Sequence, residues 1–514
     1  MVLRLKSLWF PVIGMLALVA SFDARAPSSA PQQAPPGEPD AYVLVVGDPG
    51  QVRTALRAAG GEERFALSDG TIAARVPAAQ VQSLSSAPGV GHVFADDAVA
   101  FTDGGESDSA NRSPETSQAF QEAVHAPEVW NGGVDGSQVT VAVLDTGIKP
   151  RPETRTRILA APFGNADTVG HGTFVAGLIA GNDDNGFRGI APHANLVDIR
   201  AVGANGTSRI SDLIRGIDWA VQNRVRYNIR VLNISASASA PSSYLTSPLN
   251  AAVERAWFSG IVVVVAAGNS GPNNQAISVA PANDPFVITV GALDDLGTDA
   301  WNDDALASWS SGGTTVDNIS KPDVVAPGRH LISWLAKGKP QLARELPERV
   351  VDDNYIRLSG TSASAPVVAG IAALILDKNP ALTPDQVKAL ITGNALPLPG
   401  SSSPRADAYG AVFGQPGRNV NVGRPINLIL AAAAHKFDLK SIPASTSWSS
   451  LNLASITWGT LKWDPAQLKS ITWDSITWDS ITWDSITWDS ITWDSITWDS
   501  ITWDAAHFDV VEGE

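Results

Sequence analysis

Short, almost continuous apolar runs alternate with longer helical patterns between residues 119 and 434, and this alternation is the strongest constraint on the fold. Helical patterns such as Ile210–Asn223 and Ala365–Asp377 lie between or after the apolar runs. Strands this apolar are typical of a parallel sheet that is covered on both faces. We therefore expect an α/β doubly wound domain over 119–434. The expected strands are Val139–Leu144, Leu196–Val202, Val231–Ile234, Ile261–Ala266 and Val287–Val290.

The first 26 residues have the pattern of an export signal. Arg4 and Lys6 precede a mostly apolar run, Leu8–Ala20, and the small residues at 24–26 form a cleavage site. The alternative is a membrane anchor, but this run is shorter than the roughly 20 residues that cross a bilayer as a helix. We expect residues 1–26 to be removed, so that the mature protein is secreted to the extracellular space and carries no membrane span.

A Pro/Ser/Gln-rich linker, 27–40, leads into a small unit at 41–103. Its pattern is strand, helix, strand, helix, strand, with a weaker strand near Phe65, which predicts a ferredoxin-like α+β plait. The pieces are Ala41–Val46, Gln51–Ala59, Gly70–Val76, Ala78–Leu84 and Val90–Ala95. The polar residues at 104–118 show no apolar periodicity and predict an exposed, cleavable linker.

The C-terminal segment, 435–514, is a Trp-rich acidic tail. The pentapeptide SITWD repeats seven times between Ser470 and Asp504, and residues 470–514 hold ten carboxylates with no Lys or Arg. If each Asp-Ser pair forms a corner, the repeats predict a β-solenoid with Ile and Trp on one face. A flexible acidic tail, an aromatic array that binds a surface or glycan, and a self-associating cross-β segment are the alternatives.

Composition excludes several classes of function. The chain has no cysteine, which removes disulfides, thiolate metal sites, cysteine nucleophiles and lipoprotein anchoring. Its 52 acidic and 36 basic residues give a formal charge of −16. Because nucleic-acid binding needs a basic surface, we expect no nucleic-acid partner.

Two residues at element ends suggest chemistry. Asp145 ends an expected strand, where ligands of α/β sheets bind. An aspartic peptidase would need a second DTG or DSG triplet, which the chain lacks. His171 opens a helical segment of small and β-branched residues, HGTFVAGLIAG. Taken singly, a capping aspartate and a hydrogen-bonded surface histidine are equally good interpretations.

A third residue, Ser362, lies in GTSASAP, immediately before the apolar run VVAGIAALIL. Pro366 is expected in the first turn of that helix, which places the serine near the positive end of the helix dipole. A serine nucleophile needs a base, and the base needs a carboxylate to fix its tautomer. Asp145, His171 and Ser362 supply all three groups. Asn269, after the run IVVVVAAG, is either a turn residue or an oxyanion donor.

These residues belong to a series of motifs in which the chain resembles the subtilases, the subtilisin-like serine peptidases. VAVLDTGI, HGTFVAG, GIAPHANL, VLNIS, AAGNSG, KPDVVAPG and GTSASAP occur in the family's order. The resemblance implies a catalytic triad of Asp145, His171 and Ser362, with Asn269 in the oxyanion hole, and polypeptides as substrates. It also implies that two segments line the substrate cleft: Ser235, Ala236 and Ser237, and Ala266, Ala267 and Gly268.

The resemblance extends to the N-terminal unit and to metals. Residues 41–103 resemble the family's inhibitory propeptide, so we expect a zymogen that Ser362 itself cuts between about Thr102 and Ser117. The chemistry requires no cofactor, but many relatives hold structural calcium. Asp183, Asp184 and Asn185 form either a calcium loop or a solvated turn. The competing functional hypothesis is an inactive subtilase scaffold that binds a partner or surface through its Trp-repeat tail.

Overall fold

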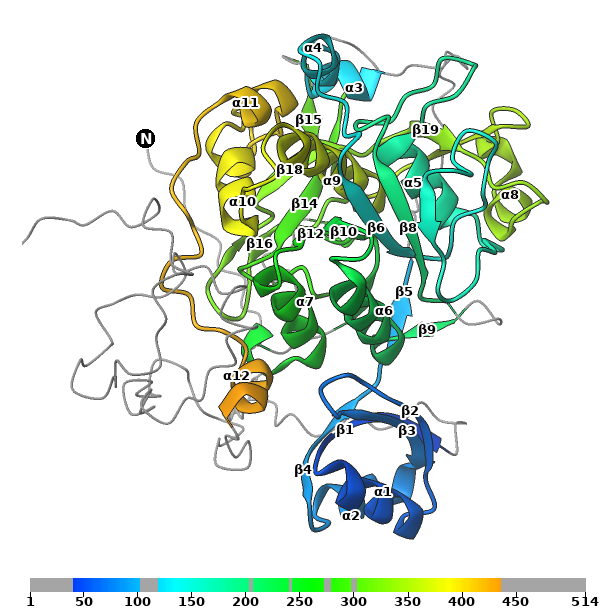
Figure 1. Cartoon of the computed structure of the whole chain (residues 1–514), viewed down its shortest axis with the longest axis vertical. Helices are drawn as coiled ribbons and strands as arrows, with labels where there is room; N and C mark the ends of the chain where they lie inside the picture. The colour runs from blue at the N-terminus through cyan, green and yellow to red at the C-terminus, as the bar shows by residue number, and fades with distance from the viewer. Residues whose placement is uncertain are drawn as a thin grey trace, which may run out of the picture.

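A computed structural model describes residues 40–101, 119–202, 207–239, 243–271, 279–296 and 303–435 of the chain. The expected signal peptide, the linker at 104–118 and the SITWD repeats lie outside the described residues. The described part comprises a small N-terminal unit and a larger α/β domain (Figure 1).

An eight-stranded sheet forms the centre of the larger domain. Its order is β15-β14-β12-β10-β6-β8-β7, and β18 also pairs with β14. All neighbouring strands run parallel except β14 and β15. The sheet is therefore mostly parallel, as the apolar runs predict. Its strands are β6 (Thr140–Asp145), β7 (Ile158–Ala160), β8 (Asn195–Arg200), β10 (Ile229–Ile234), β12 (Val262–Ala266), β14 (Ile288–Asp294), β15 (Ala305–Leu306) and β18 (Val324–Pro327).

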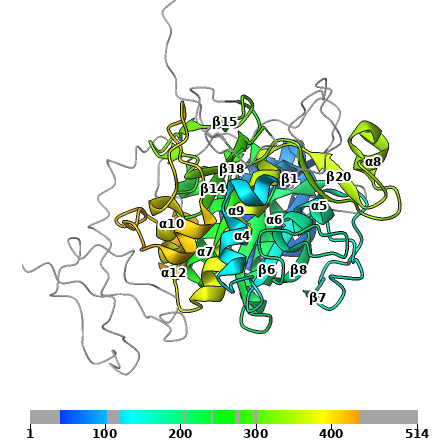
Figure 2. The ribbon, with the colours of Figure 1, turned by 90° about the horizontal axis from the view of Figure 1, so that it is seen from above.

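Helices cover both faces of this sheet (Figures 1 and 2). α5 (His171–Ala180) and α9 (Thr361–Lys378) pack on one face, with α10 (Pro384–Gly393) and α11 (Ala408–Phe413) against α9. α6 (Ile210–Asn223) and α7 (Pro248–Phe258) pack on the other. α9 is long and apolar enough to cross a membrane, but its most apolar window is 89% buried inside the domain. Its composition is therefore explained by its place in the core.

The start of α9 differs from the expectation. The helix begins at Thr361, four residues earlier than predicted, so Pro366 lies inside it and not in its first turn. Proline is tolerated there only if the carbonyl four residues earlier finds another donor. That carbonyl belongs to Ser362.

The remaining elements of the larger domain are short and peripheral. They are α3 (Ala119–Ala123), α4 (Ala126–Asn131), β16 (Gly313–Thr314), β17 (Ser320–Lys321), β19 (Leu331–Trp334), α8 (Gln341–Glu345), β20 (Tyr355–Leu358), α12 (Leu428–His435) and the 3₁₀ turns η2 (Tyr244–Thr246) and η3 (Pro347–Arg349).

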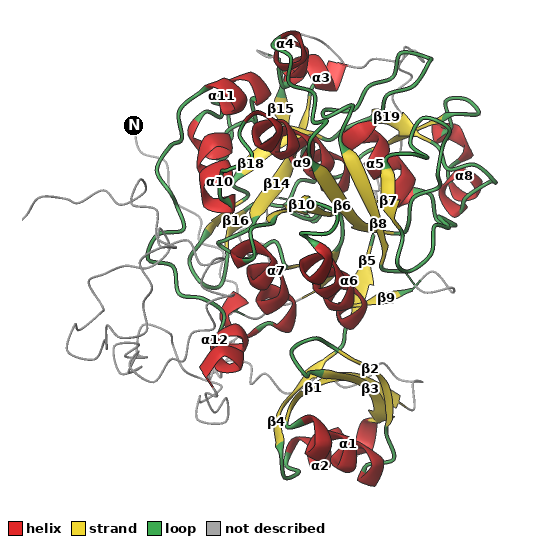
Figure 3. Cartoon of the chain, viewed as in Figure 1, coloured by secondary structure: helices red, strands yellow, loops and turns green. Residues whose placement is uncertain are grey.

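The N-terminal unit has its own sheet and core. Its antiparallel sheet has the order β2-β3-β1-β4, and its connections are those of a ferredoxin-like plait. Both helices lie on the side of the sheet that faces away from the larger domain (Figure 3). The elements are β1 (Asp40–Gly47), α1 (Pro49–Ala58), β2 (Glu62–Ala66), β3 (Ile72–Pro77), the 3₁₀ turn η1 (Ala78–Gln80), α2 (Val81–Ser85) and β4 (Val90–Ala95).

A strand from the end of the N-terminal unit inserts into the larger domain. β5 (Ala98–Ala100) pairs antiparallel with β9 (Ser208–Arg209) on one side and with β11 (Ser237–Ser239) on the other. β11 in turn pairs with β13 (Val279–Ala280). The two units are thus joined by a continuous four-stranded sheet, β13-β11-β5-β9.

Candidate active site

Asp145 and His171 meet at the carboxyl edge of the central sheet. Asp145 is the last residue of β6, and His171 is the first residue of α5. His171 Nδ1 lies 2.8 Å from Asp145 Oδ1, and both side chains are buried. A carboxylate accepts hydrogen bonds, so Nδ1 carries the proton and Nε2 has the lone pair when the ring is neutral. Nε2 has no hydrogen-bond partner among the described residues.

A close backbone approach brings the two elements together. A Cβ atom at Gly172 would lie 2.2 Å from the carbonyl oxygen of Gly147, which has a φ of 114°. Only glycine fits either position, since one needs the space and the other the left-handed backbone. The DTG and HGT glycines therefore set the distance between the carboxylate and the imidazole.

Asp167 ties the same two segments together, and sequence reasoning did not find it. Its Oδ1 accepts hydrogen bonds from Thr146 Oγ1 and the Gly170 amide, and its Oδ2 accepts from the amide and hydroxyl of Thr173. Thr146 Oγ1 then accepts the Gly172 amide at the start of α5. Burial raises the pKa of Asp167, although all four hydrogen bonds oppose this. The available signal was its position four residues before His171.

The pKa of His171 is raised. Burial by itself lowers it, but the charge of Asp145 and its hydrogen bond outweigh burial, and Asp167 adds to the upward shift. The imidazolium form is therefore stabilised where a proton is to be held temporarily. This is the electrostatic requirement for a histidine that acts first as a base and then as an acid.

Ser362 is the second residue of α9, directly after Gly360, whose φ of 153° makes the sharp turn into the helix. α5 packs against α9, so His171 and Ser362 lie at the starts of two neighbouring helices. Pro366 has no amide hydrogen to donate to the Ser362 carbonyl. Ser235 Oγ donates instead, at 3.0 Å, and itself accepts from Asn233 Nδ2 at 2.9 Å.

Asn269 lies beside the start of α9 with its amide orientation fixed. Its Oδ1 accepts hydrogen bonds from the Thr361 amide, at 2.9 Å, and from Thr361 Oγ1, at 3.0 Å. A backbone amide can only donate, so the atom that faces Thr361 is the oxygen and Nδ2 points away from it. Thr361 Oγ1 also accepts the Gly268 amide at 3.0 Å. Sequence reasoning singled out Asn269 but not the threonine that orients it.

The two predicted cleft segments lie in different places around this centre. Ser237 begins β11, whose outer edge is paired with β5, while Ser235 contacts Ser362. Ala266 ends β12, and the chain then runs to Gly268 beside Thr361. Phe101, which follows β5, has its ring centre 6.4 Å from that of His171. A strand of the N-terminal unit therefore occupies the edge of β11 and reaches the histidine.

Asp198 is a further acidic group behind the site that sequence reasoning missed. It lies in the middle of β8, next to Val143 of β6, and is fully buried. Burial, followed by the charges of Asp167 and Asp145, raises its pKa to about 8, while the Ile148 amide and Arg200 oppose the shift. The available signal was a lone carboxylate in an otherwise apolar strand.

The 183–185 turn does not fit a calcium site. Asp183 Oδ1 accepts the amides of Asn185 and Phe187, and Oδ2 accepts Trp334 Nε1 at 3.1 Å and Tyr355 Oη at 2.8 Å. Calcium needs oxygen lone pairs directed at the ion, and here N–H and O–H donors occupy them. Among the described residues, no cluster of three or more acidic or histidine side chains could hold a metal.

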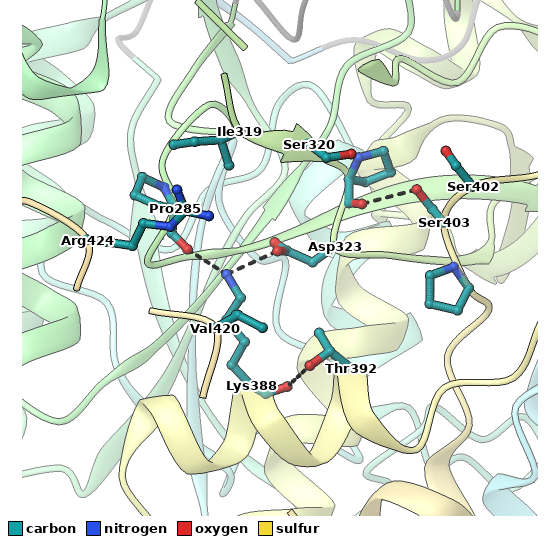
Figure 4. Close-up of a pocket in the computed structure, with 12 residues that line it drawn as sticks. Pro285, Ile319, Ser320, Asp323, Lys388, Thr392, Ser402, Ser403, Val420 and Arg424 are labelled. Carbon is teal, nitrogen blue, oxygen red and sulfur yellow. Dashed lines mark hydrogen bonds and ion pairs between the residues drawn. The ribbon is translucent and has the colours of Figure 1, made fainter. Parts of the chain in front are cut away.

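A separate pocket of about 280 Å³ lies at the opposite edge of the sheet (Figure 4). Pro285 and Asp323 line it just before β14 and β18 begin. Lys388 Nζ donates to the Pro285 carbonyl at 2.6 Å and lies 3.1 Å from Asp323 Oδ1, while Lys321 Nζ lies 2.7 Å from Asp323 Oδ2. This buried ion cluster joins α10 to the sheet and is remote from the triad.

Comparisons with known proteins agree with this geometry. The model of the subtilase family matches residues 136–411. Serine protease AprX of Bacillus subtilis is 43% identical over 290 residues, which cover 52% of this chain and 64% of AprX. Subtilisin BL of Lederbergia lenta is 34% identical over 280 residues, 54% of this chain and 90% of that protein.

A solved structure supports the fold. Fervidolysin from Fervidobacterium pennivorans, a keratinolytic enzyme related to subtilisin, superposes with a TM-score of 0.56 at 22% identity, covering 74% of this chain and 62% of fervidolysin. The chain thus spans less than two thirds of the length of AprX and of fervidolysin. The family match covers more than half of the chain, and the full length of the subtilisin-like fold is present. The chain therefore belongs to the subtilase family.

Proposed function

We propose that the protein is a serine endopeptidase in which Ser362 is the nucleophile, His171 the base and then the acid, and Asp145 the group that orients His171. The observation that carries this proposal is the buried Asp145–His171 hydrogen bond, with Nε2 as the ring nitrogen left to exchange a proton. Such a nitrogen is expected at a catalytic histidine and is costly elsewhere in a protein interior.

The chemical steps follow from these positions. His171 Nε2 takes the Ser362 proton as Oγ attacks the carbonyl carbon of a peptide bond, and the imidazolium is stabilised by Asp145. The proton then passes to the leaving amine, and an acyl ester remains on Ser362. Water, activated by the same histidine, hydrolyses the ester and frees the carboxylate product.

The tetrahedral oxygen formed in each step is stabilised by Asn269. Because Thr361 holds Oδ1, the Nδ2 group is pre-oriented and needs no reorganisation when charge develops. The N-terminus of α9 adds the positive end of a helix dipole at Ser362. We assign Asn269 to the oxyanion hole on this basis.

Substrate polypeptides bind as an added strand on the edge of β11. Main-chain hydrogen bonds supply the affinity in this mode, and side chains supply selectivity. Ser235, Ala236 and Ser237 form one wall of the cleft, and Ala266, Ala267 and Gly268 the other. The pairing of β5 with β11 supports this assignment, since a segment of the chain itself already uses that edge as a strand.

Residues 41–103 are an inhibitory propeptide in this proposal. The contacts of the unit with α6 support it: Asp96 Oδ1 accepts the Ser211 amide at 2.8 Å, and Asp96 Oδ2 accepts Ser211 Oγ at 2.7 Å. A carboxylate of the N-terminal unit thereby caps the first turn of a helix in the larger domain. Arg64 completes the contact with Asp96, at 2.9 Å, and with Asp212, at 3.3 Å.

A second polar contact lies one helical turn further along α6 and beyond. Ser68 donates its amide and hydroxyl to Asp218 Oδ2, at 2.9 and 2.7 Å, and Arg255 of α7 pairs with Asp69 and with Asp218. With β5 in the cleft, these contacts block substrate until the connecting chain is cut. The zymogen would be exported through the signal at 1–26, with 119–434 as the catalytic domain and 435–514 as an appended tail.

The first test compares precursor chains, residues 27–514, with serine or alanine at position 362. The wild-type chain should lose the N-terminal unit and then hydrolyse casein, whereas Ser362→Ala should stay intact and inactive. Equal loss of the unit from both chains would assign the cut to another protease. A folded wild-type chain that cuts neither itself nor casein would instead favour an inactive scaffold that works through its tail.

A further inference from the structure

We infer that Ser362 cuts the precursor between Thr102 and Asp103, and that the residues before this bond, Val99-Ala100-Phe101-Thr102, define the preferred substrate. This inference rests on the proposed function and assigns the bond that it leaves open. It moves the end of the propeptide one residue before the boundary expected from the sequence. Thr102 and Asp103 themselves lie outside the described residues, so the argument uses their neighbours.

The register of β5 on β11 fixes the position of the cut. Ala100 pairs with Ser237 and Val99 pairs with Ala238 in an antiparallel ladder. In such a ladder, each step forward on one strand is one step back on the other. Position 101 therefore falls opposite Ala236, and position 102 falls opposite Ser235.

Ser235 is the residue of this segment that contacts the nucleophile's own backbone. Its hydroxyl donates to the Ser362 carbonyl at 3.0 Å. The chain that follows Phe101 is thus delivered to Ser362 at position 102, and the carbonyl of that residue is the one presented for attack. A register one residue earlier or later would bring a different bond opposite Ser235.

Phe101 gives an independent check on the register. Its ring lies against the His171 ring, with centroids 6.4 Å apart, and it packs on the main core of the larger domain. A side chain on the histidine belongs to the residue before the attacked carbonyl, because successive side chains of an extended strand point in opposite directions. The other side of the strand is then left for the residue at 102.

The opposite strand edge holds the same register. Val99 pairs with Ser208 and Ala98 with Arg209 of β9. The Ile210 amide donates to the Asp97 carbonyl at 3.0 Å, and the Ser211 amide to Asp96 Oδ1 at 2.8 Å. A slip by one residue would break both edges of the ladder and remove the carboxylate cap from α6, so the precursor has one favoured alignment.

The chemistry at this bond is that of the proposed mechanism. Ser362 Oγ forms a bond to the Thr102 carbonyl carbon, and its proton passes through His171 to the amide nitrogen of Asp103. The Thr102–Asp103 C–N bond breaks and leaves a free amine on Asp103. Water then cleaves the ester, which gives a carboxylate on Thr102 and restores the Ser362 hydroxyl.

Mass spectrometry of the released fragment tests the position of the cut. Purified 27–514 precursor is sampled during the first part of maturation, with Ser362→Ala as the uncut reference. The fragment is expected to end at Thr102 and the larger chain to begin at Asp103. A Ser362-dependent fragment that ends at any other residue overturns this inference but leaves the peptidase intact. Absence of both self-cleavage and casein hydrolysis overturns the proposed function as well.

Two further measurements separate the bond from its sequence context. Asp103→Pro should slow release of the fragment about 100-fold, because a tertiary amide at the cut misplaces the leaving nitrogen. The matched variant Ser107→Pro should mature at the wild-type rate. Unchanged maturation of Asp103→Pro, or equal slowing of both variants, contradicts the inference.

Peptide p-nitroanilides test the predicted preference on the matured enzyme. Val-Ala-Phe-Thr-p-nitroanilide should have a kcat/KM at least about tenfold above that of the permuted Val-Phe-Ala-Thr-p-nitroanilide, which moves the aromatic ring away from His171. The two peptides have the same composition, so hydrophobicity does not account for a difference. Equal rates, or a faster permuted peptide, would show that the register of β5 does not report how substrates bind.

Discussion

Ser235 Oγ donates a hydrogen bond to the carbonyl of Ser362, the one carbonyl of α9 from which Pro366 withholds its usual donor. A proline inside a helix thus leaves an acceptor at the nucleophile, and the neighbouring cleft segment fills it. The position of the nucleophile is thereby linked to the strand that binds substrate.

A double-mutant cycle tests this link. Ser235→Ala should lower the free energy of unfolding by about 1–3 kcal/mol, because it removes a buried donor and the acceptor of Asn233. Pro366→Ala supplies an amide to the Ser362 carbonyl, so Ser235→Ala should cost less in that background. Urea unfolding of the four chains, all carrying Ser362→Ala to prevent self-digestion, measures the coupling. Strict additivity would contradict the link.

The orientation of Asn269 should depend on the Thr361 hydroxyl. Thr361→Val removes the donor to Oδ1 and the acceptor of the Gly268 amide, whereas Thr361→Ser keeps both. We expect Thr361→Val to lower kcat by about tenfold or more, approaching the 100- to 1,000-fold loss that is typical of removing an oxyanion donor. KM should change little, and Thr361→Ser should restore most of kcat. Equal kcat values for the Val and Ser variants would rule out this positioning role.

Much of this site follows from short segments of sequence. Asp145, His171 and Asn269 stand at element ends that local patterns reveal, and Ser362 stands beside a turn glycine. The alternation of apolar runs and helical patterns likewise predicts the parallel sheet. These features depend on neighbours in the chain, which a single sequence displays.

The rest depends on contacts between distant segments. Asp167 and Thr361 act only because loops bring them to other motifs, and the ladder between β5 and β11 joins residues more than 130 positions apart. The start of α9 was misplaced because proline is a strong local signal against a helix interior. Its exception is made by Ser235, which no local pattern can show.

The buried carboxyl of Asp198 should make stability depend on pH. Its folded pKa of about 8 lies above the unfolded value of about 3.9, so the folded state binds the proton more tightly. The free energy of unfolding should therefore fall as pH rises towards 8, by up to about 1.4 kcal/mol per pH unit from this group.

Asp198→Asn cannot titrate and should escape this loss. In the Ser362→Ala background, the variant should gain thermal stability relative to Asp198 between pH 5 and pH 8, with the gap widening as pH rises. The exposed Asp184→Asn serves as the control and should show a constant gap. A gap for Asp198→Asn that stays constant or narrows would mean that the carboxyl is not held protonated.

The ion cluster in Figure 4 should respond asymmetrically to substitution. Asp323→Asn leaves two buried ammonium groups without their carboxylate, which should cost about 3–5 kcal/mol. Burial already lowers the pKa of Lys321 to about 7, against the opposing charge of Asp323. Lys388→Met leaves the neutral Lys321–Asp323 pair and should cost less.

Urea unfolding gives the order of these two losses, and kcat/KM of the folded fraction should be unchanged in both, since the cluster lies at the far edge of the sheet. A larger loss for Lys388→Met would mean that its hydrogen bonds to the Pro285 and Val287 carbonyls outweigh the charge balance.

Covalent labelling with a fluorophosphonate tests the central claim most directly, because this probe reacts only with an activated serine. The matured wild-type chain should gain one probe per molecule, and fragment-ion masses should place it on Ser362. A precursor whose cleft is still occupied by β5 should label more slowly. Ser364→Ala, a change two residues away on the same helix turn, should still label, whereas His171→Ala should not. A probe on any other serine, or equal labelling without His171, would contradict the assignment of Ser362 as the nucleophile.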